Sequence, residues 1–128
     1  MNAKRFLTAV LVLLAAGLIG SATARADTTA GEAVFKSRCA NCHTLTGGLS
    51  TIAPDLTGVV GRKAGSLKGY QYSAALRNSD IVWTPEKLEQ WLSSPHGVAV
   101  ETEMAFTGLK GEKEREDLIG FLKQHVAK

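Results

Sequence analysis

The five residues CANCH, Cys39 to His43, contain both cysteines of this 128-residue chain, and a histidine directly follows the second one. Four kinds of chemistry use two thiols at this spacing: a disulfide, half of a zinc site, a thiol redox motif, and covalent attachment of haem. The remainder of the sequence is needed to choose among them.

The N-terminal segment has the pattern of a secretory signal peptide. Lys4 and Arg5 form a positively charged start, an apolar run follows over 6–19, and Ala24-Arg25-Ala26 resembles a cleavage site of the A-x-A kind. The run is shorter than the roughly 20 residues of a membrane-spanning helix. We therefore expect residues 1–26 to be a cleaved signal peptide, and the mature protein to be periplasmic. An uncleaved anchor is the alternative.

Removal of the signal peptide would change the net charge. The whole chain has 15 Lys and Arg against 12 Asp and Glu, which gives a formal net charge of +3. Lys4, Arg5 and Arg25 precede residue 27 and all 12 acidic residues lie at residue 27 or after it, so the mature domain, residues 27–128, would be neutral. Nucleic-acid-binding domains carry a basic patch, and we expect no nucleic-acid partner here.

A mature chain of about 100 residues is a single small domain. Small exported domains usually need a staple beyond their core. A disulfide between Cys39 and Cys42 would close too short a loop to stabilise much. A zinc site lacks its other ligands, because His96 and His125 lie far from the motif and from each other. A thiol redox motif would need a βαβ context, and no strand pattern flanks CANCH.

Covalent haem fits the motif. Cys39 and Cys42 would each form a thioether to a vinyl group, and His43 would bind the iron as the proximal ligand. The macrocycle would also supply apolar surface to a chain that is poor in aromatic residues. The second axial ligand is expected to be Met104, because Met1 leaves with the signal peptide. His96 is the rival, in a turn-like segment where we expect it to be exposed.

Helix signals predict an all-α fold with three to five short helices wrapped around one haem. Capping-box spacing in Thr29 to Glu32 predicts a helix from about residue 30 to the CANCH motif. Thr84 before Pro85 predicts an N-cap and a helix to about residue 93. Two further helices are expected over 74–77 and from 112 to about 126.

Glycine at position 31 predicts where two of these helices meet. Gly31 and Phe35 are four residues apart and share a helix face. Leu118 and Phe121 lie on the apolar stripe of the last helix. We therefore expect the first and last helices to cross at Gly31.

Together these motifs make the chain resemble the class I cytochromes c, in particular the bacterial periplasmic carriers closest to mitochondrial cytochrome c. The resemblance covers nearly all of residues 27–128. Its motifs, in order, are Gly31 and Phe35, Cys39 to His43, Ala53 to Gly58, Gly61 to Lys63, Tyr70 to Tyr72, Trp83, Pro95, Met104 to Gly108, and Glu114 to Leu122.

The resemblance implies roles for five further residues. The carbonyl of Pro54 should accept a hydrogen bond from His43 and so orient the proximal ring. Phe106 should cover the haem edge beside Met104. Three donors should lie at the haem propionates: Arg62, Tyr72 and Trp83.

The resemblance also implies the function, a soluble electron carrier with one c-type haem and His/Met ligation. It would not be an enzyme, and as a monomer it would dock transiently at the haem edge to membrane or periplasmic redox complexes of a respiratory or photosynthetic chain. Glu103 stands where relatives carry a lysine, so we expect a more neutral, partly apolar docking face. An enzyme with an open sixth position and a structural haem subunit of a larger complex are the alternatives.

Overall fold

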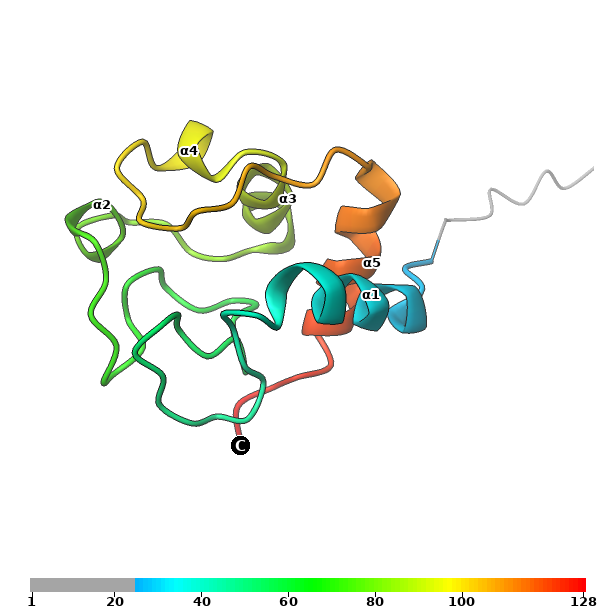
Figure 1. Cartoon of the computed structure of the whole chain (residues 1–128), viewed down its shortest axis with the longest axis horizontal. Coiled ribbons are helices and arrows are strands. Elements are labelled where there is room, and N and C mark those ends of the chain that lie inside the picture. Colours follow the sequence, from blue (N-terminus) through cyan, green and yellow to red (C-terminus); the bar gives the residue numbers. More distant parts are fainter. Residues whose placement is uncertain (1–24) are drawn as a thin grey trace, which may run out of the picture.

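The computed structural model describes residues 25–128, so the predicted signal peptide lies almost entirely outside the described part. Within residues 25–128 there are five α-helices, one π-helical turn and no strand, which confirms the all-α prediction (Figure 1). In order they are α1 (Thr28–Val34), the π-helical turn η1 (Phe35–Cys39), α2 (Ala74–Arg77), α3 (Pro85–Ser93), α4 (Pro95–Val98) and α5 (Glu112–Leu122). None of these helices has the length and apolar character needed to cross a membrane.

Helix α1 begins earlier than its capping-box spacing predicts. The N-cap is Asp27, whose side chain accepts hydrogen bonds from the backbone N–H groups of Thr29 and Ala30. The expected cap at Thr29 is therefore wrong. Aspartate caps a helix as well as threonine does. The backbone N–H of Asp27 also donates to Asp117 of α5, a contact between distant residues that local spacing cannot reveal.

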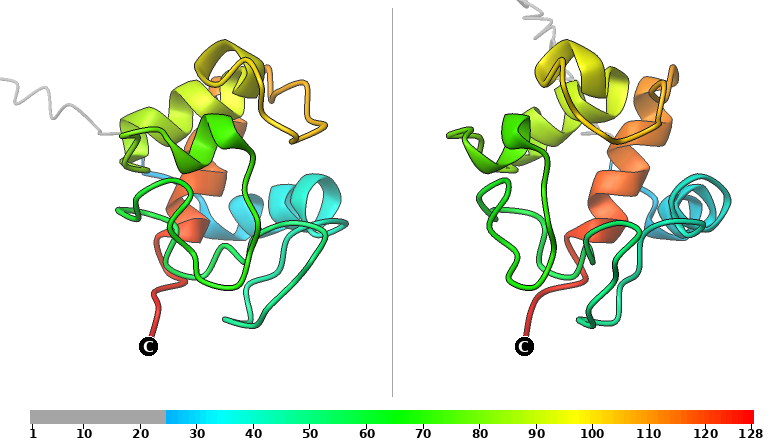
Figure 2. Two further views of the ribbon diagram at one scale, coloured as in Figure 1. Left: turned by 90° about the vertical axis from the view of Figure 1, so that its left-hand side faces the viewer. Right: turned by 60° about the vertical axis from the view of Figure 1, so that its left-hand side comes forward.

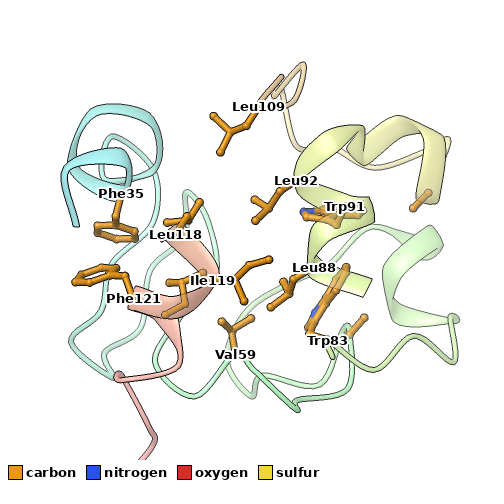
Figure 3. Packing of buried hydrophobic residues seen from close by; sticks show 13 residues of the cluster. Phe35, Val59, Trp83, Leu88, Trp91, Leu92, Leu109, Leu118, Ile119 and Phe121 are labelled. Atoms are coloured by element: carbon orange, nitrogen blue, oxygen red, sulfur yellow. The ribbon is translucent and has the colours of Figure 1, made fainter. Parts of the chain in front are cut away.

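The first and last helices cross at Gly31, as expected (Figure 3 shows the aromatic pair beside the crossing). A Cβ atom added to Gly31 would lie 2.0 Å from the carbonyl oxygen of Asp117 and 2.7 Å from the Cβ of Phe121. Phe35 and Phe121 pack with their ring centroids 5.7 Å apart, and Leu118 is completely buried. Only glycine permits this close approach of α1 and α5.

Helix α3 carries a second part of the same core. Thr84 caps it through the N–H of Lys87, and Pro85 occupies its first turn, as the sequence predicts. Leu88 and Trp91 are buried on one face of α3. The rings of Trp91 and Trp83 pack edge to face with their centroids 5.0 Å apart (Figure 3). Trp83, the residue just before the N-cap, therefore covers part of the apolar face of α3.

The end of α5 differs from the prediction. The helix stops at Leu122 rather than near residue 126, and Val126 is exposed. The carbonyl oxygen of His125 instead accepts a hydrogen bond from the N–H of Gly58. This contact ties the C-terminal segment to the loop that follows the CANCH motif.

Candidate haem site

The CANCH motif begins where η1 ends and forms a tight turn. The backbone N–H groups of Cys42 and His43 lie 3.0 and 2.9 Å from the carbonyl oxygen of Cys39. Both cysteines are free thiols; Cys39 is half-buried and Cys42 is exposed. Burial raises the pKa of Cys39 to about 11, although the charge of Arg38 opposes the shift. Redox-active thiols have a depressed pKa, so this environment does not support the thiol redox alternative.

The imidazole of His43 is held in one orientation by Pro54. Its Nδ1 lies 2.7 Å from the Pro54 carbonyl oxygen. A carbonyl can only accept, so Nδ1 carries the proton and Nε2 keeps its lone pair. Burial lowers the pKa of His43, against the opposing effects of this hydrogen bond and of Asp55. The ring is therefore neutral at pH 7 and able to bind a metal through Nε2.

Asp55 is a functional residue that the sequence reasoning missed. It is only 2% exposed and directly follows Pro54. Its carboxylate accepts hydrogen bonds from Thr44 Oγ1 at 2.6 Å and from the backbone N–H groups of Thr46, Gly47 and Thr57 at 2.9, 3.2 and 2.8 Å. These bonds fold the loop 44–57 back on itself and so hold Pro54 opposite His43.

The pKa of Asp55 reports the strength of that network. Burial pushes its pKa up, but the hydrogen bonds from Thr44, Thr57 and Thr46 outweigh burial and lower it to about 2. The carboxylate is therefore ionised at neutral pH. The sequence signals for this role were weak: Asp55 lies within the Ala53 to Gly58 motif, and threonines occur at positions 44, 46 and 57.

Arg62 is tied to the same loop and leaves one buried donor unpaired. Its two terminal nitrogens donate to the carbonyl oxygens of Thr57 and Asp55, both at 3.0 Å. Its Nε and the hydroxyl of Ser73 are buried with no hydrogen-bond partner. Unpaired buried donors are costly, which indicates that an acceptor outside the polypeptide belongs there.

Tyr72 and Trp83 both interact with Arg62. Burial raises the pKa of Tyr72, and the charge of Arg62 is the first of the effects that oppose this rise. The backbone of Trp83 pairs with that of Arg62, N–H to oxygen at 2.9 Å, while its ring packs on Trp91. The structure therefore pairs Trp83 with Arg62 through the backbone, and the role of Arg62, Tyr72 and Trp83 at the propionates stays a prediction.

Met104 and Phe106 lie on a different segment, the irregular stretch between α4 and α5. Both are half-buried against the core. The guanidinium of Arg38 lies 5.9 Å from the centroid of the Phe106 ring, which connects this stretch to η1. In Figures 1 and 2 this stretch runs with α3 and α4, apart from the loop that follows CANCH. No polar contact joins Met104 to His43.

These residues have the chemistry that haem requires. The site offers two free thiols, an imidazole with a free Nε2 and a thioether, which are the groups that attach and ligate a c-type haem. The unpaired donors at Arg62 and Ser73 suit carboxylates such as propionates. Within residues 25–128 no three His, Cys, Asp or Glu side chains gather into a metal site. Fold and site together define a small helical haem protein.

Comparison with known proteins agrees with this class. The family model for cytochrome c matches residues 28–125. The chain is 45% identical over 101 residues to cytochrome c of Cochliobolus lunatus, which covers 78% of this chain and 94% of that one. Cytochrome c of Arabidopsis thaliana is 44% identical over 101 residues, with coverage of 78% and 90%. The solved structure of cytochrome cH from Methylobacterium extorquens aligns with a TM-score of 0.72 and 38% identity, and covers 77% of this chain and 98% of that one.

The chain belongs to the cytochrome c family, as a class I c-type cytochrome. Its cofactor is haem c, bound covalently through two cysteines. Cys39 and Cys42 are the only two cysteines in the sequence.

Proposed function

We propose that this protein is a soluble periplasmic electron carrier in which His43 and Met104 would hold the haem iron. The observation that carries the proposal is the hydrogen bond of 2.7 Å between His43 and Pro54, beside two free thiols. Residues 1–26 would be a cleaved signal peptide and residues 27–128 the mature domain. The proposal rests on the cytochrome c family for electron transfer and on these residues for the ligands.

Each residue of the site has a defined task in this proposal. His43 donates Nδ1–H to Pro54 and so presents Nε2 to the metal in a fixed orientation. Met104, the one methionine of residues 27–128, supplies a soft thioether, which favours the reduced state. Bound haem supplies a one-electron couple between ferrous and ferric iron. Arg62, Tyr72 and Trp83 would stabilise the buried propionates with their donors.

Two protein ligands distinguish a carrier from an enzyme. If His43 and Met104 both stay bound, no coordination position is open to a substrate. Electrons would then be exchanged only through the haem edge. Phe106 would then shield the haem edge beside Met104 from water. A peroxidase-like enzyme would instead need Met104 to be absent or labile.

The docking face should be mostly neutral and partly apolar. Leu49 and Ile52, in the loop after CANCH, are 79% and 72% exposed. Glu103 precedes Met104 and is also exposed. Three positive residues are also exposed and could contact a partner: Lys36, Arg38 and Lys110. With so few of them we do not expect strong positive steering, so encounters with membrane or periplasmic redox complexes would be weak and transient.

The ligand assignment can be tested with Met104→Ala and the control His96→Ala. Both variants should be purified with haem from a host that has the attachment machinery. In Met104→Ala we expect the far-red ferric absorption band that accompanies sulfur–iron bonding to vanish, an exogenous ligand such as imidazole to bind tightly, and the midpoint potential to fall. His96 is exposed and its ring lies on the surface near Val100, so His96→Ala should leave the spectrum unchanged.

Three outcomes would count against the proposal. An unchanged spectrum in Met104→Ala would remove Met104 from the coordination sphere. Loss of the low-spin spectrum in His96→Ala would make His96 the ligand instead. A wild-type protein that is high-spin at rest would favour an enzyme.

A further inference from the structure

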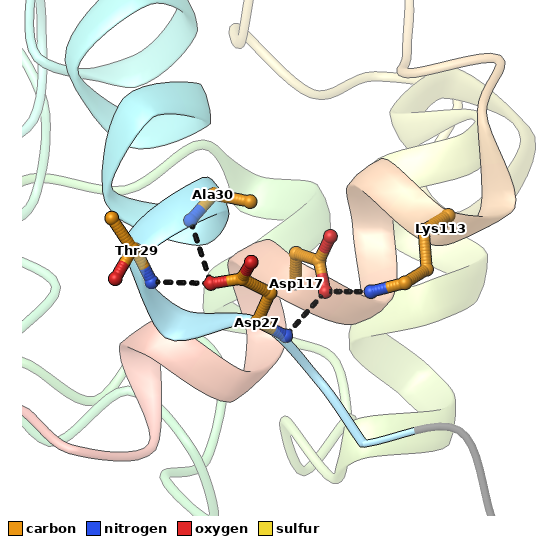
Figure 4. Close-up of polar contacts among 5 residues, drawn as sticks. All are labelled: Asp27, Thr29, Ala30, Lys113 and Asp117. Carbon is orange, nitrogen blue, oxygen red and sulfur yellow. Dashed lines mark hydrogen bonds and ion pairs between the residues drawn. The ribbon is translucent and has the colours of Figure 1, made fainter.

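The backbone nitrogen of Asp27 makes an unusual contact at the entrance of α1. It lies 2.6 Å from Oδ1 of Asp117, a residue 90 positions later in the chain (Figure 4). The side chain of Asp117 is only 7% exposed, and the Nζ of Lys113 contacts the same oxygen. A buried carboxylate in the middle of α5 thus points at the first atom of residue 27.

The carboxylate of Asp27 itself is occupied elsewhere. Its Oδ1 accepts from the N–H groups of Thr29 and Ala30 at 3.0 and 3.1 Å, which caps α1 (Figure 4). The side chain of Asp27 is thus used for capping, and the backbone N–H of Asp27 donates its hydrogen bond to Asp117 instead.

The residues before Asp27 pack on α5 without any polar anchor of this kind. Arg25 and Ala26 line a pocket with Glu116, Gly120 and Lys123. The Cβ of Ala26 lies 2.5 Å from the position that a Cβ on Gly120 would occupy. The polar contacts that hold this end of the chain therefore begin at residue 27, the first residue after the predicted cleavage point.

We propose that hydrolysis of the Ala26–Asp27 peptide bond creates an α-ammonium group that forms an ion pair with Asp117 and fastens the mature N-terminus to the α1–α5 crossing. In this step water adds its hydroxyl to the Ala26 carbonyl carbon and its hydrogen to the Asp27 nitrogen, which then takes up a proton. The inference rests on the cleaved signal peptide of the proposed function. The new element is the role of the mature N-terminus, which would hold α1 against α5.

The charges around this point favour the pair. After hydrolysis, the ammonium and carboxylate of Asp27, the carboxylate of Asp117 and the ammonium of Lys113 form an alternating group of four. Charged donors bind a carboxylate about twice as strongly as a neutral N–H does. The hydrogen bond from Lys113 lowers the pKa of Asp117 more than its burial raises it, and the N–H of Asp27 adds to that lowering, so the acceptor is ionised. The other charged groups at this corner are Glu116 and Lys123.

The test uses the exported, haem-bearing protein, isotopically labelled with ¹⁵N. Mass spectrometry of its N-terminal peptide should show Asp27 as the first residue. Titration followed by NMR should then give an α-amino pKa about one unit above the ordinary range of about 7.7 to 8.0. In Asp117→Asn the α-amino pKa should return to that range. The control Glu116→Gln removes an exposed neighbouring charge and should change it little.

Several results would overturn the inference. A mature chain that starts at another residue has no ammonium at this position. An α-amino pKa in the ordinary range in the wild type would contradict the ion pair, and this measurement decides the question even if Asp117→Asn does not fold. Either result would leave the His43 and Met104 assignment intact, because that assignment is read from the haem spectrum.

Discussion

The helix crossing at Gly31 and the loop 44–57 flank the CANCH motif on either side, yet they are held by different forces. At the crossing, α1 and α5 touch because nothing but hydrogen projects from Gly31, and Phe35 packs on Phe121. In the loop, one buried carboxylate, Asp55, gathers four hydrogen bonds. The helical side should therefore be sensitive to volume, and the loop side to charge and pH.

The largest effect is expected from Gly31→Ala. The added methyl group would lie 2.0 Å from the carbonyl oxygen of Asp117, which is backbone and cannot rotate away. The helices would have to separate, so the free energy of unfolding should fall by about 3 kcal/mol or more. Denaturant titration of the haem-bearing protein measures this. Ala33→Val, on the exposed side of the same helix, should cost about 0.5 kcal/mol; equal losses in the two variants would contradict a steric cause.

Asp55→Asn should have the next largest effect. It keeps the shape of the side chain but removes the charge that four donors share, and hydrogen bonds to a charged group contribute about 1.5–3 kcal/mol. We expect a loss of about 2 kcal/mol, together with a shifted midpoint potential because Pro54 is no longer held on His43. The control is Asp80→Asn. The side chain of Asp80 is fully exposed and pairs only with Lys63 at 3.3 Å. If both variants behave alike, Asp55 does not organise the loop.

The pH dependence separates the loop from the crossing further. The folded pKa of Asp55 is about 2, against an ordinary 3.8. A carboxylate whose pKa is lower in the folded than in the unfolded state stabilises the fold at pH values above the unfolded pKa. Asp55 should therefore contribute about 2 kcal/mol to the free energy of unfolding above pH 4, and this contribution should be lost as the pH falls toward 2. The stability difference between the wild type and Asp55→Asn should therefore shrink between pH 7 and pH 2.5. A constant difference would exclude ionised Asp55 as the cause.

The smallest effect is expected from Gly47→Ala. Gly47 has a φ of 72°, and no atom lies within 4 Å of an added Cβ. Only backbone conformation opposes the substitution, which should cost about 1 kcal/mol. Its neighbour Gly48 lacks a positive φ, and an added Cβ would lie 3.2 Å from Oγ1 of Thr46, the end of a side chain that can rotate, so Gly48→Ala should cost less than Gly47→Ala. Comparing Gly47→Ala with Gly48→Ala measures backbone strain separately from the steric clash at Gly31. If Gly47→Ala lowered the free energy of unfolding as much as Gly31→Ala does, backbone strain and steric clash could not be told apart.

The same contrast explains what could be predicted from the sequence. The cap at Thr84, the helix over 74–77 and the crossing at Gly31 follow from local patterns and glycine spacing, and the structure confirms them. The haem motif is equally local. The CANCH string needed no knowledge of the fold, whereas Met104 as the second ligand stays a prediction.

What could not be predicted depends on contacts between distant segments. The start of α1 at Asp27 is fixed partly by Asp117, and the end of α5 by a bond from Gly58 to His125. The role of Asp55 depends on four donors that converge only once the loop is closed. Polar networks of this kind leave no periodic signal in a sequence.

Attachment of haem at the CANCH motif is tested most directly by a mass measurement. Trypsin cleaves after Arg38 and next after Arg62, so Cys39, Cys42, His43, Pro54 and Asp55 fall in one peptide. In protein exported with haem-attachment machinery, we predict that this peptide carries the mass of one haem and has no thiol that an alkylating reagent can modify. A peptide of unmodified mass in which both cysteines are alkylated would contradict the account.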